Sequence, residues 1–533
     1  MNRSNPTGSS RSIGGADFLQ LDPSEAPAGG LADWLTDRLR TAISSGHLPI
    51  GARLPATRTL AADLGISRGV VTESYQRLTE DGQVAGRGRS GTVVVAAPIT
   101  PGHGRSAPVV GADRGRPPGV GAAPVADRAT GRSRLRIRTR PPETPSGAGD
   151  FTDTSCRSAH DLEIFDSLRS APARIDLTPG VPDLAAFPRT AWLRAERAVL
   201  AELRSAEFGY GDPAGVPALR RAVAAWLARY RGIAADPEDL IVVAGVAQGI
   251  GIVAQMLDQH GIHEIAVEDP GSLGSRQHLQ GWGMQTPPVP VDDRGLRVEV
   301  LRDSTAPVVM TTPAHHFPTG VVLDGERRRE LIQWAADGGL IIEDDYDAEH
   351  RYDRPPVPAL RALLPDRVIY LGSVSKLLAP ALRIGWMLAP PQYKDELIAR
   401  KRLADLGNAS LPQLTLAHLM DSGELERQLR FLRRRHRTRR DAMVTAIRNH
   451  LPTATIHGAA AGLHLTITFA GKEDDTALAA AALEAGVKCH PLSWHCQLPH
   501  TPGLVLGYAA RTPTEITEAI TTIAEVSSAR VEG

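Results

Sequence analysis

Lysine is rare in this chain: only five of its 60 lysine and arginine residues are lysines. A guanidinium stays protonated and cannot condense with an aldehyde, whereas a lysine amine can form a Schiff base. A lysine kept in such an arginine-rich sequence therefore marks a position where only an amine serves. Among the five, Lys376 has the neighbours that make this interpretation specific.

Cysteine and long apolar runs are scarce as well. Three cysteines, Cys156, Cys489 and Cys496, provide no disulfide framework and are typical of a reducing compartment. No apolar stretch approaches the roughly 18–20 residues of a transmembrane helix, and the first ten residues lack the apolar core of a signal peptide. A cytoplasmic protein without membrane contact is therefore expected. The formal net charge is zero, so affinity for nucleic acid would need a local basic patch.

The 533 residues are enough for two or three domains. Residues 1–20 predict a disordered tail, and residues 21–96 predict a compact helical unit. Residues 97–170 are rich in Pro, Gly, Ala and Arg without apolar periodicity, which predicts a flexible linker. Within residues 171–533, apolar runs alternate with helical patterns, which predicts an α/β domain with a mainly parallel sheet. The expected buried strands lie at 241–245, 264–269, 307–312, 339–344 and 367–372.

The unit at 21–96 has the order of a winged helix-turn-helix: two helices, a third helix that begins after Ser67, and a glycine-pivoted hairpin. The third helix would present its N-terminal amides and Arg68 to the major groove. Arg58, Arg87 and Arg89 would neutralise phosphates. A small docking domain with surface arginines is the alternative interpretation.

Lys376 lies close to groups that suit a phosphate. Ser373 and Ser375 supply hydroxyls, and Arg383 supplies a cation seven residues on. This context predicts the anchor lysine of pyridoxal phosphate (PLP). Val246 and Ala247 begin a helix after a strand and a glycine turn, and their backbone amides are candidates for holding the phosphate.

Acidic residues follow the apolar run at 339–344, where open α/β sheets bind ligands. One carboxylate there could pair with the pyridine nitrogen, and Tyr346 could bind the phenolic oxygen of the ring. An acidic loop that is simply solvated, or a weak divalent-metal site, is the alternative.

Residues 54–84 resemble the winged helix of the GntR family, and residues 175–525 resemble a fold-type I aminotransferase. Joined in this order, they resemble the MocR/GabR family of PLP-dependent regulators. The resemblance implies a smaller C-terminal α+β subdomain at about 400–530, a double-stranded DNA operator, a small-molecule effector and a homodimer, often head-to-tail. It assigns the Schiff base to Lys376, the pyridinium to Asp344, the phenolate to Tyr346, phosphate contacts to Ser373, Arg383 and the amides of Val246 and Ala247, and DNA contacts to Arg58 and Arg68.

Three features of the large domain depart from that family. Ser272 stands where many members have a tyrosine that stacks on the cofactor, and His316 replaces the usual glutamine. The segment 503–509 lacks the arginine that relatives use for a substrate carboxylate, and Arg511 is a possible substitute. The effector is therefore expected to differ from an ordinary α- or γ-amino acid, and PLP itself is a candidate.

Three functions fit these features. The first is a transcriptional regulator that senses an amine, an amino acid or PLP. The second is a working aminotransferase with an accessory DNA-binding domain, in which Lys376 is also the general base. The third is a DNA-binding protein that has lost PLP.

Two further clusters are expected to be structural. Cys489, His490, His495 and Cys496 alternate across a strand and should not converge on a metal ion. The arginines between Arg427 and Arg440 predict a solvated helix face rather than a second DNA surface.

Overall fold

The computed structural model describes residues 21–95, with gaps at 28–29, 45–47, 49–50, 82 and 87–90, and residues 170–532, with gaps at 353–356 and 472–473. The predicted tail, nearly all of the predicted linker and Cys156 lie outside these ranges. No helix within the described ranges is both long and apolar enough to cross a membrane.

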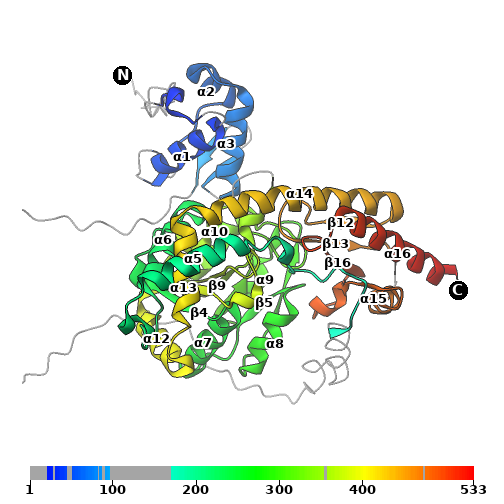
Figure 1. Cartoon of the computed structure of the whole chain (residues 1–533). Helices are drawn as coiled ribbons and strands as arrows, with labels where there is room; N and C mark the ends of the chain where they lie inside the picture. Colours follow the sequence, from blue (N-terminus) through cyan, green and yellow to red (C-terminus); the bar gives the residue numbers. More distant parts are fainter. Residues whose placement is uncertain are drawn as a thin grey trace, which may run out of the picture.

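The N-terminal unit is the expected winged helix-turn-helix (Figure 1). Its elements are α1 (Leu31–Ser44), α2 (Thr57–Leu64), α3 (Arg68–Glu80) and the antiparallel pair β1 (Val84–Gly86) and β2 (Thr92–Val94). Gly65 ends α2 in the left-handed conformation with φ 64°, and the Ser67 hydroxyl caps α3 by accepting from the Val70 amide at 3.4 Å. Leucines such as Leu39 and Leu60 form the core of this unit.

The large domain is built on an eight-stranded sheet in the order β4-β11-β10-β9-β8-β5-β6-β7. Its strands are β4 (Leu240–Val243), β5 (Ala266–Asp269), β6 (Pro288–Asp292), β7 (Gly295–Leu296), β8 (Val308–Thr311), β9 (Leu340–Asp345), β10 (Val368–Ser373) and β11 (Gly385–Leu388). All five predicted strands are present. Four of them, β5, β8, β9 and β10, are neighbours in the sheet and pair in parallel. The antiparallel strand β11, absent from the prediction, lies between β4 and β10.

Helices cover both faces of this sheet, which is why most residues of its strands are apolar. Alternate residues of β4 show the division: Leu240 and Val242 face one core, and Ile241 and Val243 face the other. The helices of this domain are α5 (Arg189–Glu202), α6 (Pro217–Arg231), α7 (Val246–Gln259), α8 (Leu273–Gly281), α9 (Val298–Asp303), α10 (Gly325–Ala336), α11 (Leu360–Leu363), α12 (Pro391–Asp405) and α13 (Ser410–Asp421).

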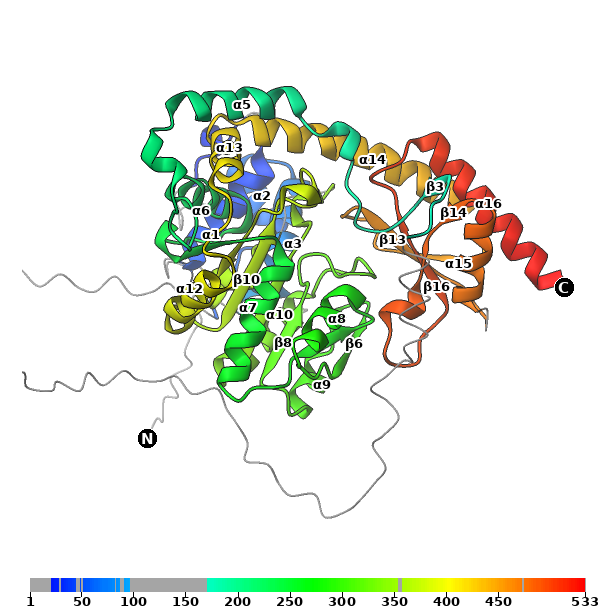
Figure 2. The ribbon, with the colours of Figure 1, turned by 60° about the horizontal axis from the view of Figure 1, so that its bottom comes forward.

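A smaller α+β subdomain lies beside the large domain (Figure 2). It contains the antiparallel sheet β12-β13-β16-β15 and the parallel pair β14-β3. The elements are β3 (Ile175–Asp176), β12 (Thr455–His457), β13 (His464–Thr468), α15 (Asp475–Glu484), β14 (Val487–Lys488), β15 (His490–Pro491), β16 (Gly503–Gly507) and α16 (Pro513–Glu532).

The long helix α14 (Glu424–His450) connects the two parts. Leu429 packs in the core of the large domain, whereas Ile447 packs in that of the subdomain. Helix α13 and the end of α12 fall inside the predicted range 400–530, but Leu397 of α12 and Leu416 of α13 pack both helices against the large sheet. The small subdomain therefore begins in the middle of α14, and it also includes β3 from much earlier in the chain.

Candidate functional site

The predicted ligand groups meet at the carboxyl ends of β9 and β10. Asp344 belongs to β9 and Tyr346 follows it, while Ser373 ends β10 and Lys376 lies in the turn after it. The two strands are parallel neighbours, with Leu371 opposite Asp344. The parallel pairing explains why residues about 30 positions apart in the chain reach the same edge of the sheet.

The Lys376 amine lies against a glycine of the chain segment that leads from β3. A Cβ atom on Gly180 would be 3.2 Å from Nζ, and Gly180 has a φ of 76°, so a side chain at this position would crowd the amine. On the other side, His350 Nε2 is 3.3 Å from the Lys376 carbonyl oxygen. The Gly180 backbone therefore lies beside the amine, and the His350 side chain contacts the backbone of Lys376.

Asp344 is buried, and its Oδ1 atom has no hydrogen-bond partner among the described residues. Burial, followed by the neighbouring Asp345, raises the pKa of Asp344 to about 7, and Lys376 opposes this rise. A buried carboxyl with an open oxygen is suited to a ligand that brings a protonated nitrogen, because such a partner would stabilise the carboxylate.

The two acidic neighbours of Asp344 already have partners. Asp345 accepts from Arg231 and the Tyr370 hydroxyl, and Glu343 accepts from the amides of Leu360 and Arg361, both at 2.9 Å. Side chains alternate along a strand, so Asp344 points to the opposite face from these two. The acidic run is therefore a buried strand end rather than a solvated loop.

The Tyr346 hydroxyl contacts His315, a residue that was not predicted to belong to the site. The hydroxyl is 3.0 Å from Nδ1 of His315, and the same nitrogen is 3.0 Å from Oδ2 and 3.1 Å from Oδ1 of Asp347. His315 belongs to the turn-rich loop after β8, 32 residues before Asp347. No periodic pattern in the sequence links the two, and only the fold brings them together.

Amides and a guanidinium meet at the start of α7. Gly245 caps this helix with a φ of 76°, and a Cβ atom there would lie 2.9 Å from Nη1 of Arg383. Arg383 has a left-handed φ of 51° and donates to the Ala244 carbonyl. The first residues of the helix, Val246 and Ala247, present their amides at the same end, which is the geometry of an anion site.

The hydroxyls next to Lys376 form a local turn. The Ser373 hydroxyl accepts from the Ser375 amide at 3.3 Å. Both residues are partly exposed and lie between β10 and Lys376.

Each departure from the family has a clear structural place. The Ser272 hydroxyl caps α8 by accepting from the Ser275 amide at 3.2 Å. Ser272 and Asp344 both line a cavity of about 30 Å³. His316 is buried, with its Nε2 atom 3.5 Å from Oε2 of Glu268, and burial lowers the pKa of His316. Arg511 donates to the Asp176 carbonyl at 3.0 Å and lies 3.7 Å from Glu515, so other groups already hold its guanidinium.

In the N-terminal unit, Arg58 lies in the first turn of α2 and Arg68 in the first turn of α3, and both are exposed, as is Ser67. Arg87 and Arg89 lie outside the described residues. The three described candidates are therefore exposed at the helix ends.

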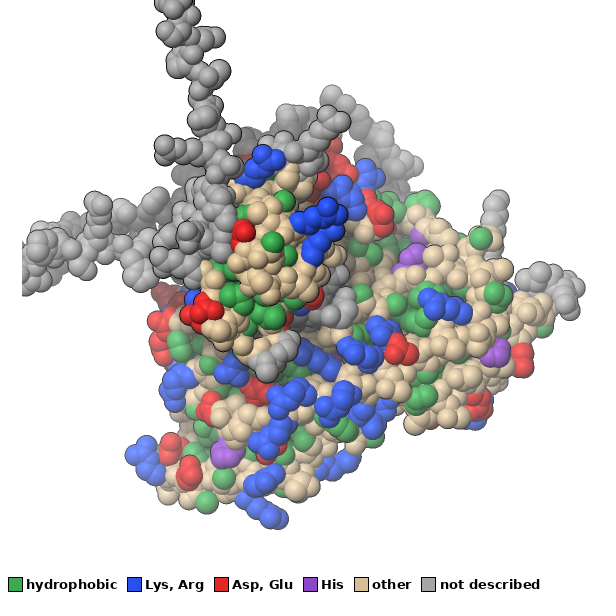
Figure 3. Space-filling view, turned by 90° about the horizontal axis from the view of Figure 1, so that it is seen from above, with side chains coloured by type: hydrophobic (Ala, Val, Ile, Leu, Met, Phe, Trp, Pro, Cys, Tyr) green, Lys and Arg blue, Asp and Glu red, His purple; other side chains and the backbone are tan. Residues whose placement is uncertain are grey.

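Basic side chains gather on the face of the large domain beside the N-terminal unit (Figure 3). Four arginines of α14 are exposed and share one side of the helix: Arg427, Arg430, Arg434 and Arg437. Arg439 of the same helix is buried and donates to Asp183 at 2.8 Å. The interpretation of the exposed stripe as a solvated face stays a prediction.

The residues Cys489 to Cys496 have separate partners. His495 Nδ1 is 3.2 Å from the Gly271 carbonyl, and Cys496 donates to the Leu492 carbonyl at 3.3 Å. Within the described part of the chain, no three His, Cys, Asp or Glu residues are grouped as metal ligands.

The burial of His436 should make the stability of the folded protein depend on pH. His436 lies on α14 with its ring 5.0 Å from that of His350, and neither ring nitrogen has a hydrogen-bond partner among the described residues. Burial, then His350, Arg439 and Arg435, lowers the pKa of His436 to about 2. The unfolded chain binds a proton below about pH 6.5 but the folded chain does not, so His436 makes the protein lose stability as the pH falls below that value.

We expect His436→Leu to remove this loss. Measured by denaturant unfolding, its gain over the wild type should grow by about 1 kcal/mol between pH 6.5 and pH 5.5. His450→Leu, at the exposed end of the same helix, is the matched control and should show no such growth. A gain that does not depend on pH would contradict the burial of a neutral imidazole.

Two family models match the chain. Residues 31–94 match the gntR family of bacterial regulatory proteins, and residues 173–523 match aminotransferase class I and II. The two matches cover the N-terminal unit and nearly all of the remaining described residues.

Curated relatives match both parts together. A probable rhizopine catabolism regulatory protein MocR of Rhizobium meliloti is 32% identical over 501 residues, which is 92% of each chain. The pyridoxine biosynthesis transcriptional regulator PdxR of Corynebacterium glutamicum is 30% identical over 452 residues, 84% of this chain and 85% of that protein. Among solved structures, a kynurenine aminotransferase of Pyrococcus horikoshii superposes with a TM-score of 0.64 at 25% identity, over 71% of this chain and 96% of its own.

Proposed function

This chain belongs to the MocR-type regulators, which join a GntR helix-turn-helix to an aminotransferase class I and II domain, and we propose that it couples a metabolite bound near Lys376 to operator binding. The observation that carries the proposal is the open oxygen of buried Asp344 at the strand end next to Lys376, in a chain that also exposes Arg58 and Arg68 at helix ends. A sensor needs both sites in one molecule.

The cofactor is pyridoxal phosphate, whose aldehyde condenses with amines and whose ring withdraws electrons. We assign Lys376 as the residue that binds the aldehyde carbon, Asp344 as the partner of the pyridine nitrogen, and Tyr346 as the partner of the ring oxygen. The phosphate is assigned to the amides of Val246 and Ala247, the hydroxyls of Ser373 and Ser375, and the guanidinium of Arg383. Two observations support this fit: the Asp344 Oδ1 atom has no partner among the described residues, and the Gly245 backbone lies directly against the Arg383 guanidinium.

The effector is proposed to be an amine, an amino acid or PLP itself. Relatives named for rhizopine catabolism and for pyridoxine biosynthesis make small metabolites of this kind reasonable candidates. Because Arg511 is held by the Asp176 carbonyl and Glu515, it supports no carboxylate contact beside Lys376. An effector regulates only if it binds one domain arrangement more tightly than the other.

The DNA partner is a double-stranded operator, with Ser67 and Arg68 at the start of the recognition helix and Arg58 on the preceding helix. Exposure of these side chains and the capped start of α3 support contacts to phosphates and base edges. Steady conversion of an amino acid and a keto acid by the purified protein would instead support the aminotransferase alternative.

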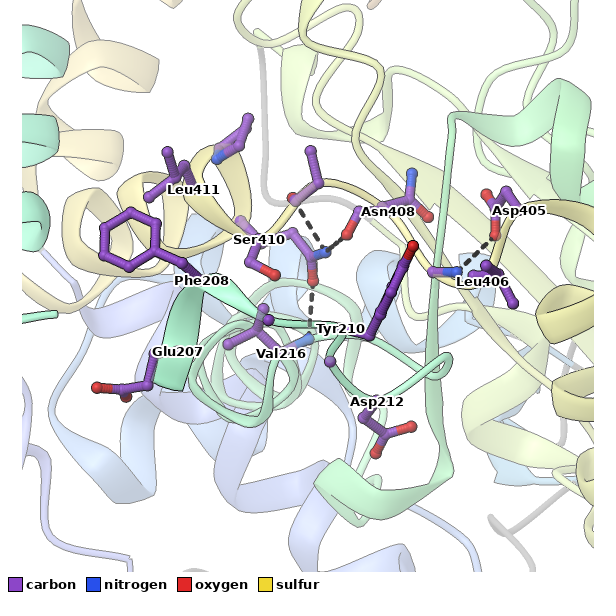
Figure 4. Close-up of a pocket in the computed structure, with 16 residues that line it drawn as sticks. Glu207, Phe208, Tyr210, Asp212, Val216, Asp405, Leu406, Asn408, Ser410 and Leu411 are labelled. Atoms are coloured by element: carbon purple, nitrogen blue, oxygen red, sulfur yellow. Dashed lines mark hydrogen bonds between the residues drawn. The ribbon is translucent and has the colours of Figure 1, made fainter. Parts of the chain in front are cut away.

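A homodimer is proposed because apolar side chains are exposed around one cavity of the large domain. The cavity is about 430 Å³ in volume, and Tyr210, Phe208 and Leu406 line it from two separate chain segments (Figure 4). Tyr210 is 93% exposed, and Leu403, three residues before Leu406, is 88% exposed, which is unusual for large apolar side chains. A second copy of the chain would cover them.

Leu403→Glu should weaken this dimer by at least about tenfold, because a charge would be buried at the contact. Molar mass by light scattering across a dilution series measures the change. Leu498→Glu, at an exposed leucine of the small subdomain, is the control and should leave the mass unchanged. A wild-type protein that is monomeric at every concentration would contradict the dimer.

A further inference from the structure

One ring nitrogen of His315 has two neighbours that compete for it. Both carboxylate oxygens of Asp347 and the hydroxyl of Tyr346 lie 3.0–3.1 Å from Nδ1. Neither His315 nor Asp347 has access to solvent, since the side chain of each is 1% exposed. Water therefore cannot relieve the competition, and the position of one proton settles it.

The carboxylate decides where that proton lies. A carboxylate only accepts hydrogen bonds, so an unprotonated Nδ1 would set one lone pair against another in a buried place. His315 therefore carries its hydrogen on Nδ1 and donates to Asp347. An Nδ1–H cannot accept, so the Tyr346 oxygen can only accept from His315, and its own proton is left to point elsewhere.

The surroundings keep His315 in this place. A Cβ atom on Gly462 would lie 2.0 Å from Cε1 of His315, so the glycine backbone packs directly on the imidazole. The His464 ring lies 5.3 Å away, and burial lowers the pKa of His464 to about 3, so it is a neutral neighbour. His316, His350 and Asp347 are the other titratable groups that face His315.

Among the described residues, the Tyr346 hydroxyl has no hydrogen-bond partner other than His315. The tyrosine follows β9, two residues after Asp344, at the same strand end as Lys376. Its proton is thus available to a ligand in the site between these residues.

We propose that His315 and Asp347 are positioning residues that hold the Tyr346 hydroxyl with its proton directed toward the ring oxygen of bound pyridoxal phosphate. The proposal rests on the proposed function, because it needs that cofactor at Lys376. Its consequence concerns the state of the cofactor: a ring oxygen that accepts the tyrosine proton holds a proton on the Lys376 nitrogen less firmly.

The test is a pH titration of the visible absorbance of the full-length protein loaded with PLP. Tyr346→Phe removes the hydroxyl and should raise the midpoint by about one pH unit, the size expected for one hydrogen bond to an anionic oxygen. Asp347→Asn should raise the midpoint by a similar amount, because without the carboxylate His315 can carry its hydrogen on Nε2 and accept the tyrosine proton at Nδ1. The double variant should show no more than the Tyr346→Phe shift.

The sign of the shift separates this account from simple electrostatics. Loss of the Asp347 charge alone would disfavour a proton on the Lys376 nitrogen and would lower the midpoint. A lowered or unchanged midpoint in Asp347→Asn, or a full additional shift in the double variant, would overturn the proposal. An unchanged midpoint in Tyr346→Phe would overturn it as well.

A second pair of variants decides the matter if Asp347→Asn does not fold. His315→Asn keeps an N–H near the place of Nδ1 and should retain the wild-type midpoint, whereas His315→Leu should show the raised midpoint. Equal midpoints in the two variants would contradict the positioning role. His464→Gln, which can still donate to the Pro318 carbonyl, is the control for a neighbouring imidazole and should titrate as the wild type. A wild-type protein without any visible band would refute the assignment of the cofactor itself.

Discussion

Lys376→Ala should abolish the visible absorbance that PLP gives to the purified protein. The covalent link to the amine is what distinguishes this cofactor from a ligand held by its phosphate alone. The remaining contacts, to Asp344 and to the anion site at α7, are noncovalent, so we expect the cofactor to leave on gel filtration. Its affinity should fall by at least about 100-fold, the equivalent of one strong charged hydrogen bond.

Lys394→Ala is the matched control for this experiment. Lys394 pairs with Asp239 at 2.9 Å on α12, away from the strand end that carries Asp344. Its replacement should leave the spectrum unchanged. Retention of the band in Lys376→Ala, or its loss in both variants, would contradict the assignment of the anchor.

Loss of the two helix-end arginines should have the second large effect. Each arginine that contacts a base edge or a phosphate contributes about 1–3 kcal/mol, so Arg58→Ala combined with Arg68→Ala should weaken operator binding by about 100-fold or more. The slope of log affinity against log salt should fall by about 1–2, because fewer phosphates are neutralised.

Arg448→Ala, which removes an exposed arginine at the far end of α14, is the control for the loss of a surface arginine outside the N-terminal unit. We expect it to bind the operator as the wild type does. Gel shift or fluorescence anisotropy over a salt series measures both quantities. Equal affinity of the double variant and the control would show that α2 and α3 do not bind the operator in this way.

The sequence predicted the strands that appear as unbroken runs of apolar residues. Apolar runs such as 367–372 are readable because a parallel strand is buried on both faces. Strand β11 was missed because its antiparallel place between β4 and β10 depends on long-range pairing. The start of the small subdomain was not readable either, since α14 is one unbroken helix shared by two cores.

The site residues were predictable where the groups that act together are close to one another in the sequence. Lys376 and its neighbouring hydroxyls form one motif, and Asp344 follows an apolar strand. His315 and Gly180 carry no such signal. One acts through a carboxylate 32 residues later, and the other matters only because the fold brings an amine against its backbone. Contacts of this kind come from tertiary packing, which no local pattern encodes.

The central claim is that occupancy at Lys376 changes affinity at the winged helix. The most direct measurement compares operator binding by the full-length protein without cofactor, with PLP, and with PLP plus candidate amines, in wild type and in Lys376→Ala. A coupled protein should change its affinity at least about fivefold in one of these states, and Lys376→Ala should not respond. Operator affinity that is the same in every state of the wild type would contradict the claim.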